Sequence, residues 1–245
     1  MNSAALAEQM IKWMQERIQA AGAKGLVVGL SGGIDSAVVA ALAQRAVGSA
    51  VAGIMMPCHS IREDLEHAYL LARHLNMEHH EVDLTPAYDS LIAQMTGLQL
   101  TGEREQLARA NIKPRLRMTT LYYFAQSRGY LVAGTGNKSE LTVGYFTKYG
   151  DAGVDILPLA DLVKTEVREL AAYLQIPPVI IEKHPSAGLW QGQTDEKEMG
   201  FTYEQLDNYI LTGKADPAIK TKIQKMEQVS EHKRQPVPAF RRVER

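Results

Sequence analysis

A short apolar stretch near the N-terminus breaks into two adjacent glycines and then continues as an alanine-rich segment (LVVGLSGGIDSAVVAALA, residues 26–43). The apolar run from Gly25 to Leu30 does not alternate with polar residues, which is typical of a strand covered on both faces in a parallel sheet. Residues 36–47 have the composition of a helix. A buried strand joined to a helix by a glycine turn favours an α/β fold.

Strands and helices alternate along the rest of the chain. We expect further strands at residues 51–56, 79–82 and 130–133, with a very short fifth strand at 156–158. Helices are expected at residues 4–21, 61–75, 86–98, 102–128, 164–174, 178–182, 203–211 and 216–229. Pro114 disfavours helical geometry at Lys113, so the helix over 102–128 should be interrupted there. The order predicts one domain over residues 1–245, a doubly wound parallel sheet flanked by helices.

Composition limits the classes of function. The 245 residues carry a formal net charge of −1, so the sequence lacks the basic surplus of a nucleic-acid-binding protein. No stretch approaches the roughly 20 apolar residues that cross a bilayer, and the charged N-terminus does not have the pattern of a signal peptide. The single cysteine, Cys58, excludes an internal disulfide and a multi-cysteine metal site. These features predict a soluble, cytoplasmic protein that binds neither nucleic acid nor a membrane.

The turn SGGIDS (residues 31–36) has the composition of a phosphate site. Doubly wound sheets bind ligands beyond the carboxyl ends of their strands, where this turn should lie. Gly32 and Gly33 let backbone amides approach a ligand, and the N-terminus of the following helix favours an anion. Asp35 would repel phosphate unless it holds a divalent cation that bridges to the phosphate oxygens. The alternative is a tight turn in which Asp35 or Ser36 caps the helix.

This turn fits neither the Walker pattern GxxxxGK[ST] nor the dinucleotide pattern GxGxxG. It is similar to the SGGxDS loop of the PP-loop (N-type) ATP pyrophosphatase superfamily, whose members cleave ATP between the α and β phosphates. The order and spacing of the downstream segments resemble those of ammonia-dependent NAD synthetases: NIKPRLRM (111–118), GTGNKSELTVGYFTKYGD (134–151), LPLADLVKTEV (157–167) and KHPSAGLWQGQTDEKEMGFTYEQLDNYI (183–210). The resemblance covers nearly the whole chain and implies an adenine nucleotide alpha hydrolase-like, Rossmann-like fold.

The resemblance also implies an activity, which is the amidation of deamido-NAD to NAD with ATP and ammonia as the final step of NAD biosynthesis. In this reaction the nicotinate carboxylate attacks the α-phosphate of ATP, pyrophosphate leaves, and ammonia displaces AMP from the adenylate. Both steps build negative charge, so electrostatic stabilisation and Mg²⁺ should carry much of the catalysis. The family further implies a tight homodimer formed by helices comparable to 86–98 and 102–124, with the deamido-NAD site at the interface.

The motifs shared with the family imply roles for individual residues. Asp35 and Lys164 are the expected catalytic residues, and Asp35 and Glu140 are the expected Mg²⁺ ligands. ATP is expected to contact Gly29, Ser31, Gly32, Gly33, Asp35, Ser36, Arg117, Thr135, Lys164 and Ser186. Deamido-NAD is expected to contact Asn111, Arg115, Tyr145, Phe146, Lys148 and Asp151. Because Tyr145 and Phe146 are adjacent, one of them should face the pyridine ring while the other packs in the core.

Residues 183–200 show no clear periodicity and contain several glycines. The resemblance predicts that they form a lid over the adenylate, mobile without ligand, with Lys183 and Asp195 supplying contacts. The PP-loop begins at residue 31, which leaves no room before it for a glutamine amidase domain, so we expect ammonia itself as the nitrogen source.

Two alternatives to this function remain at the level of the sequence. One is another PP-loop enzyme, such as a tRNA-thiolating or GMP-forming synthetase. The other is a nucleotide-binding sensor without turnover. The basic, proline-containing tail at residues 233–245 has no assigned role.

Overall fold

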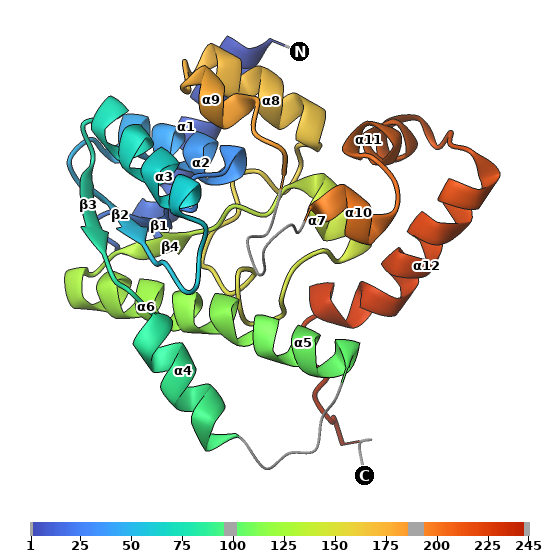
Figure 1. Ribbon diagram of the computed structural model, residues 1–245. Coiled ribbons are helices and arrows are strands. Elements are labelled where there is room, and N and C mark those ends of the chain that lie inside the picture. The colour runs from blue at the N-terminus through green and yellow to red at the C-terminus, as the bar shows by residue number, and fades with distance from the viewer. Residues whose placement is uncertain (1, 96–101, 186–193, 243–245) are drawn as a thin grey trace.

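The computed structural model describes residues 2–95, 102–185 and 194–242. Its centre is a four-stranded parallel sheet of order β3-β2-β1-β4, built from β1 (Leu26–Gly29), β2 (Val51–Met55), β3 (Glu78–Glu81) and β4 (Leu131–Ala133) (Figure 1). Leu26 of β1 pairs with Val51 on one side and with Leu131 on the other. The chain therefore changes its direction of winding between β1 and β4. The carboxyl ends of these two strands border the crevice in which such sheets bind ligands, and the expected α/β class is confirmed.

Helices cover both faces of the sheet and continue past its β4 edge (Figure 1). They are α1 (Ser3–Ala20), α2 (Ile34–Val47), α3 (Arg62–His74), α4 (Thr85–Gln94), α5 (Glu103–Ala110), α6 (Ile112–Arg128), α7 (Lys138–Val143), α8 (Lys164–Tyr173), α9 (Pro178–Ile181), α10 (Asp195–Met199), α11 (Tyr203–Thr212) and α12 (Pro217–Arg234). One apolar cluster joins α1, α2, α3 and α8 to one face of the sheet, and a second joins α6 to the other. None of the helices in the described ranges is long and apolar enough to span a bilayer.

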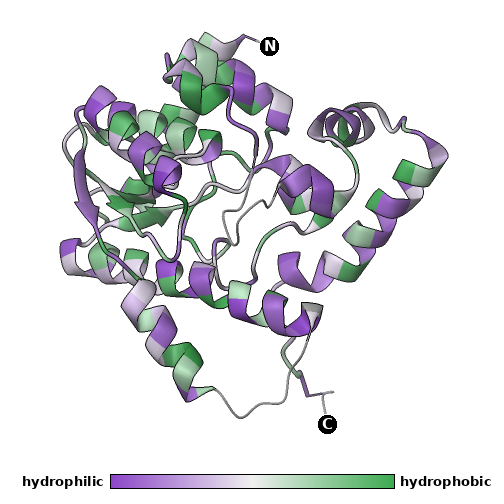
Figure 2. Ribbon diagram, viewed as in Figure 1, coloured by the Kyte–Doolittle hydropathy of each residue, from purple (hydrophilic) through white to green (hydrophobic). Residues whose placement is uncertain are grey.

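The pattern of hydrophobic residues explains this layering. All five residues of β2 and the first three of β1 are buried, and Figure 2 shows that hydrophobic residues dominate these central strands. The edge strand β3 has the polar sequence EHHE and contains no fully buried residue. The buried face of α2 is rich in alanine, and these short side chains let the helix lie close to the sheet. A separate apolar cluster around Met199, Tyr203 and Leu206 holds α7, α10, α11 and α12 together.

The helix expected over 86–98 is α4, which ends at Gln94, and residues 96–98 lie outside the described residues. Three further expected elements differ from the structure in their extent. The fifth strand is reduced to one parallel bridge between Ala133 and Ile156, because Pro158 has no N–H with which to continue the ladder. The helix over 102–128 breaks at Asn111 and not at Lys113, which is helical. Pro114 is tolerated in the first turn of α6, where its missing N–H would have had no intrahelical partner. The last helix extends to Arg234, so the basic tail begins inside α12.

Two short helices were not expected from the periodicity of the sequence. The first, α7, is only six residues long, and its signature is a capping box in which Asn137 and Glu140 each hold the other's backbone N–H. The second, α10, lies within the segment 183–200 and ends at Gly200, whose φ is +73°. Helices of this length contain too few turns to show an apolar period.

Candidate active site

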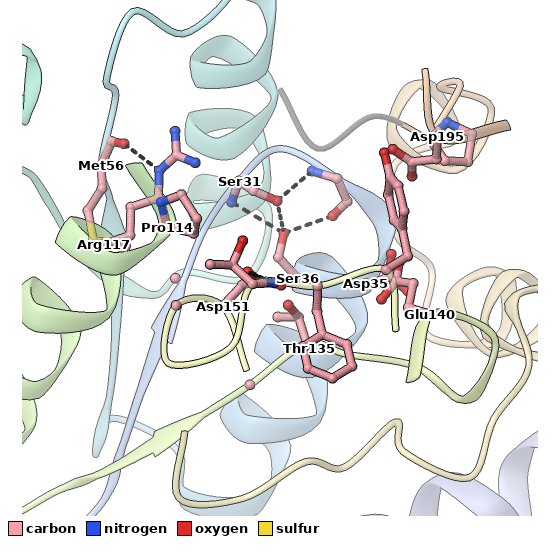
Figure 3. Close-up of a pocket in the computed structure, with 18 of the residues that line it drawn as sticks. Ser31, Asp35, Ser36, Met56, Pro114, Arg117, Thr135, Glu140, Asp151 and Asp195 are labelled. Atoms are coloured by element: carbon pink, nitrogen blue, oxygen red, sulfur yellow. Dashed lines mark hydrogen bonds between the residues drawn. The ribbon is translucent and has the colours of Figure 1, made fainter. Parts of the chain in front are cut away.

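A cavity opens at the carboxyl ends of β1 and β4, where the direction of winding changes. Its volume is about 450 Å³, and its walls come from the loops after β1 and β4, from α6 and α7, and from the ends of α8 and α12. Figure 3 places Asp35, Glu140 and Asp195 on one side of this cavity and Arg117 on the opposite side. The cavity thus brings together segments from both ends of the sequence.

The SGGIDS turn forms one end of the cavity, and hydrogen bonds within the turn fix its shape. Ser31 N–H donates to Ser36 Oγ at 3.3 Å, and Ser36 Oγ donates to the carbonyl of Gly33 at 2.8 Å. Gly33 N–H donates to Ser31 Oγ at 3.2 Å. Gly32 has a φ of +75°, and a Cβ there would lie 2.1 Å from the carbonyl oxygen of Asp64. The turn therefore requires glycine at position 32 for two independent reasons.

The helix after this turn begins without a side-chain cap. Its N-cap is Gly33, so the alternative in which Asp35 or Ser36 caps the helix is wrong. Gly33 has no side chain that could accept hydrogen bonds from the first amides of α2. These amides belong to the part of the chain in which Gly33, Ile34 and Ser36 line the cavity. The dipole of α2 stabilises an anion at this position.

The side chains of Asp35, Glu140 and Lys164 form an acid–lysine cluster on the cavity wall. The ammonium of Lys164 donates to Asp35 Oδ2 and lies 3.5 Å from Glu140 Oε1. The side chain of Lys164 is 3% exposed, whereas those of Asp35 and Glu140 are 16% and 18% exposed and reach the cavity. One ammonium balances one of the two carboxylates, so the second carboxylate would carry uncompensated negative charge when it is ionised.

The pKa values of the cluster reflect this imbalance. Burial and the charge of Asp35 raise the pKa of Glu140 to about 8, although the ammonium of Lys164 acts in the opposite direction. Burial alone would lower the pKa of Lys164, but the carboxylates of Asp35 and Glu140 outweigh it and raise that pKa above its ordinary value. Lys164 is therefore charged at neutral pH, and a further cation beside Glu140 would favour its ionised form.

The donor set of this cluster suits a hard divalent cation. Asp35 and Glu140 offer carboxylate oxygens from separate helices, which are the ligands that Mg²⁺ prefers. Within residues 2–95, 102–185 and 194–242, no group of three or more His, Cys, Asp or Glu side chains could hold a metal ion. A site with two protein ligands leaves the remaining coordination positions to water and phosphate oxygens, as is common for Mg²⁺ beside nucleotides.

The start of α8, which carries Lys164, is capped by side chains from other helices. Val163 precedes the helix, and its side chain cannot accept a hydrogen bond. Instead, Lys164 N–H donates to Ser139 Oγ at 3.0 Å, and Thr165 N–H donates to Asp207 Oδ2 at 2.8 Å. Ser139 Oγ also donates to Asp207 Oδ1, and Asp207 is 2% exposed. Helices α7, α8 and α11 thus meet at the backbone of Lys164.

A buried tyrosine of α11 lies on the other side of the same lysine. Tyr203 is fully buried, and its ring centre is 5.0 Å from the ammonium of Lys164. Its hydroxyl donates to Asp195 Oδ2 at 3.0 Å and lies 3.5 Å from Glu140 Oε1. The α10 residue Asp195, for which the sequence predicted a contact role, therefore joins the acid–lysine cluster through Tyr203.

The opposite wall carries the positive charge of Arg117. Its Nε donates to the carbonyl of Met56 at 3.2 Å, and its Nη2 donates to Ser60 Oγ at 3.3 Å. Neither partner is charged, so the guanidinium can also balance an anion in the cavity. Gly29 and Thr135 also line the cavity.

The residues expected to contact the second substrate divide into two groups. Asn111, Tyr145, Phe146 and Asp151 line the cavity. Asn111 Oδ1 accepts from Thr147 Oγ1 at 2.7 Å, and Asp151 Oδ1 accepts from Thr147 N–H at 2.9 Å. Tyr145 packs against the apolar cluster around Met199, Tyr203 and Leu206, and both Tyr145 and Phe146 line the cavity. Which of the two rings faces the pyridine ring stays a prediction.

Arg115 and Lys148 do not line the cavity of the single chain. Arg115 Nη2 donates to the carbonyl of Lys148 at 3.3 Å, and Lys148 Nζ donates to the carbonyl of His232 at 2.6 Å. Lys183 lines the cavity and forms an ion pair with Asp64 of α3. Ser186 lies outside the described residues, as does the middle of the segment expected to form a lid, residues 186–193.

Lys233, which was not expected at the site from the sequence, reaches the cavity from the last turn of α12. Its Nζ donates to the carbonyls of Gly144 at 2.7 Å and Phe146 at 2.8 Å. The neighbouring Arg234 donates to the carbonyls of Leu141 and Thr142 at the end of α7. The available signal was the pair of basic residues, which is typical of the last turn of a helix but was interpreted as the start of a tail.

Comparisons with known proteins agree on one family. A family model described as NAD synthase matches residues 6–238. The chain is 52% identical to an NH(3)-dependent NAD(+) synthetase of Carboxydothermus hydrogenoformans, with 93% of each chain covered. Among solved structures, an NMN synthetase from Francisella tularensis has a TM-score of 0.93 at 37% identity, covering 98% of this chain and 99% of that one. An NH3-dependent NAD synthetase from Campylobacter jejuni, in complex with the nitrate ion, has a TM-score of 0.81 at 31% identity, covering 98% and 100%.

Proposed function

This chain belongs to the NAD synthase family, and from that premise we propose how its cavity catalyses the ATP-dependent amidation of deamido-NAD by ammonia. The enzyme is a carbon–nitrogen ligase that carries out the final step of NAD biosynthesis. The family match excludes the tRNA-thiolating, GMP-forming and sensor alternatives. The observation that carries the proposal is the junction, in one cavity, of a glycine turn at a helix N-terminus with a buried acid–lysine cluster.

ATP is assigned to the side of the cavity formed by the SGGIDS turn. The β and γ phosphates would bind at the N-terminus of α2, against the SGGIDS turn. Ser31, Gly33 and Ser36 line the cavity there, whereas Gly32 does not, and the internal hydrogen bonds of Gly33 N–H and Ser36 Oγ would have to be exchanged for bonds to phosphate. Arg117 would balance charge from the opposite wall, and Gly29 and Thr135, which also line the cavity, would contact the nucleotide. Ser186 is retained as an expected ATP contact.

Asp35 and Glu140 would hold Mg²⁺, because they supply hard oxygen donors side by side, and the ion would favour the ionised form of Glu140. When bound, the ion would neutralise charge on the phosphates of ATP. Lys164 would then be released from its two carboxylate partners, and its ammonium would stabilise charge that develops on the α-phosphate.

Deamido-NAD would place its nicotinate carboxylate between the acid–lysine cluster and the wall formed by Asn111, Tyr145, Phe146 and Asp151. The carboxylate attacks the α-phosphate, pyrophosphate leaves, and ammonia attacks the adenylate to release AMP. The two rings would stack on the pyridine ring or enclose it, which limits the access of water to the adenylate.

The rest of the deamido-NAD molecule requires a second subunit in this proposal. Arg115 and Lys148 lie outside the cavity wall of one chain, where a partner could complete their surroundings. Leu107 on α5 and Tyr123 on α6 are 55% and 69% exposed, so these helices present large apolar side chains that a second subunit could cover. We place a homodimer interface on these helices, and sedimentation as a monomer at micromolar concentration would contradict it.

Free ammonia is the proposed nitrogen source, used by a single catalytic domain over residues 1–245. The relatives that support this proposal are named NH(3)-dependent NAD(+) synthetases, and this chain matches them over nearly their full length. Because the reaction consumes ATP, we place it in the cytoplasm.

A second acceptor is favoured by one observation. The Francisella tularensis structure with the TM-score of 0.93 is named an NMN synthetase, which implies amidation of nicotinic acid mononucleotide. The same cavity could present that shorter carboxylate to ATP, since the reacting groups are identical. Measurement of kcat/KM with ATP, Mg²⁺, ammonium and either acceptor separates the two. We expect deamido-NAD to be preferred, and a preference for the mononucleotide would replace the proposal.

A further inference from the structure

Asn137, the N-cap of α7, contacts both carboxylates of the acid–lysine cluster. Its Nδ2 donates to Asp35 Oδ1 at 2.9 Å, and its backbone N–H donates to Glu140 Oε2 at 3.3 Å. Its Oδ1 accepts from Glu140 N–H at 3.0 Å. The residue is 0% exposed, so water does not compete for these contacts. Asp35 lies 102 positions earlier in the chain, and the amide therefore joins two elements that are remote in sequence.

Asn137 and Lys164 each contact one oxygen of both carboxylates, and the Tyr203 hydroxyl also lies 3.5 Å from Glu140 Oε1. Asn137 binds Asp35 Oδ1 and Glu140 Oε2. Lys164 contacts the other oxygen of each group, Asp35 Oδ2 and Glu140 Oε1. A cation that takes the place of the lysine ammonium would meet one oxygen from each carboxylate, while Asn137 keeps the second oxygen of each.

We propose that Asn137 is a positioning residue for the Mg²⁺ site, which fixes the rotation of both carboxylates so that Asp35 Oδ2 and Glu140 Oε1 face the same cation. This inference rests on the magnesium site of the proposed function. Hydrogen bonds to ligating carboxylates orient them and tune the affinity of metal sites in general. Here Asn137 orients both ligands, through its side-chain Nδ2 for Asp35 and through its backbone N–H for Glu140.

Capping of α7 alone does not account for an asparagine at this position. The cap needs only the oxygen that accepts from Glu140 N–H, and serine or threonine supplies such an oxygen as well. Thr202 caps α11 through the same reciprocal capping box. Asparagine adds an N–H₂ donor to the capping oxygen, and it is this donor that reaches Asp35.

The substitution Asn137→Ser separates the two roles, because it keeps a capping oxygen and removes Nδ2. Thermal unfolding is followed against Mg²⁺ concentration at saturating α,β-methylene-ATP, which binds without turnover. We expect the Mg²⁺ concentration for half-maximal stabilisation to rise roughly tenfold or more. The matched control is Asn2→Ala, which removes the cap of α1, where Asn2 Oδ1 accepts from Ala5 N–H at 3.1 Å. It should lower the melting temperature without changing the Mg²⁺ requirement.

The outcomes distinguish the positioning role of Asn137 from the Mg²⁺ site on which it rests. A wild-type Mg²⁺ requirement in Asn137→Ser overturns the positioning role while the metal site stands. A wild-type protein that shows no response to Mg²⁺, or an Asp35→Asn variant that responds normally, overturns the metal site itself. If Asn137→Ser does not fold, Asn137→Thr provides the same measurement. Failure of both to fold makes the residue structural and overturns the inference.

Discussion

The two sides of the cavity are built in different ways. The phosphate side is one continuous stretch, residues 31–36, whose hydrogen bonds join residues no more than five positions apart. The acid side is assembled from α2, α7, α8 and α11, and the hydrogen bonds that Lys164 and Thr165 make there join residues 24 to 129 positions apart. The first arrangement depends on backbone conformation, and the second on the packing of helices against one another.

The difference shows which kind of change each side tolerates. Glycine conformation determines the phosphate side, so a single methyl group should disrupt it. Long-range side-chain contacts determine the acid side, so isosteric changes of remote residues should alter its function. The following substitutions test this contrast, from the largest expected effect to the smallest.

Asp35→Ala affects both sides, because Asp35 lies in the first turn of α2 and belongs to the acid–lysine cluster. We expect kcat/KM for ATP to fall at least about 100-fold, since the charge that holds Mg²⁺ and Lys164 is lost. Circular dichroism should show a folded protein. An active, folded Asp35→Ala enzyme would remove this residue from the metal site.

Gly32→Ala tests the backbone dependence of the phosphate side. A side chain at a φ of +75° costs about 1–3 kcal/mol, and the added Cβ would also lie 2.1 Å from the Asp64 carbonyl. We expect a strong loss of stability in urea unfolding, together with loss of ATP binding. Gly33→Ala is the matched control, because its Cβ would meet only Ser31 Oγ at 3.3 Å. Equal stability of the two variants would contradict the account.

Asp207→Asn tests the dependence of the acid side on remote contacts. The amide keeps an acceptor for Thr165 N–H but leaves the hydroxyl of Ser139 without its charged partner. We expect the free energy of unfolding to fall by about 1–3 kcal/mol and kcat to fall more than the KM for ATP rises. Asp161→Asn is the control, since its ion pair with Lys138 is on the surface with Asp161 95% exposed. There the change should be below about 1 kcal/mol.

The pH dependence of stability should reflect Glu140. Its pKa rises from 4.5 in the unfolded chain to about 8 in the fold, so the folded state favours the protonated carboxyl. The contribution of this group to stability is therefore complete below about pH 4.5 and declines as the pH rises to about 8. Unfolding of metal-free protein between pH 5 and 8 measures this slope. Glu140→Gln should flatten it, and an unchanged slope would contradict the assignment.

The same contrast explains how much of the molecule could be predicted from its sequence. The β1–α2 unit and its SGGIDS turn were predicted correctly, because a strand, a glycine turn and a helix are local patterns. Asp35, Glu140 and Lys164 were expected together from the resemblance to a family, and the fold brings them into contact.

The residues that hold the acid side in place could not be predicted from local sequence patterns. Ser139 and Asp207 carry no local signal for their joint role, because the hydrogen bond between them exists only when α7 packs against α11. Helices as short as α7 and α10 show no periodicity, although the capping pair Asn137 and Glu140 marked the start of α7. Lys233 was missed for a similar reason, since only the path of α12 brings it to the cavity.

A crystal structure with α,β-methylene-ATP and Mg²⁺ tests the central claim most directly. The account predicts the β and γ phosphates against the amides of residues 31–36, with the ion bound by Asp35 Oδ2 and Glu140 Oε1 and the Lys164 ammonium displaced from between them. A triphosphate bound elsewhere in the molecule, or an ion that contacts neither carboxylate, would contradict it.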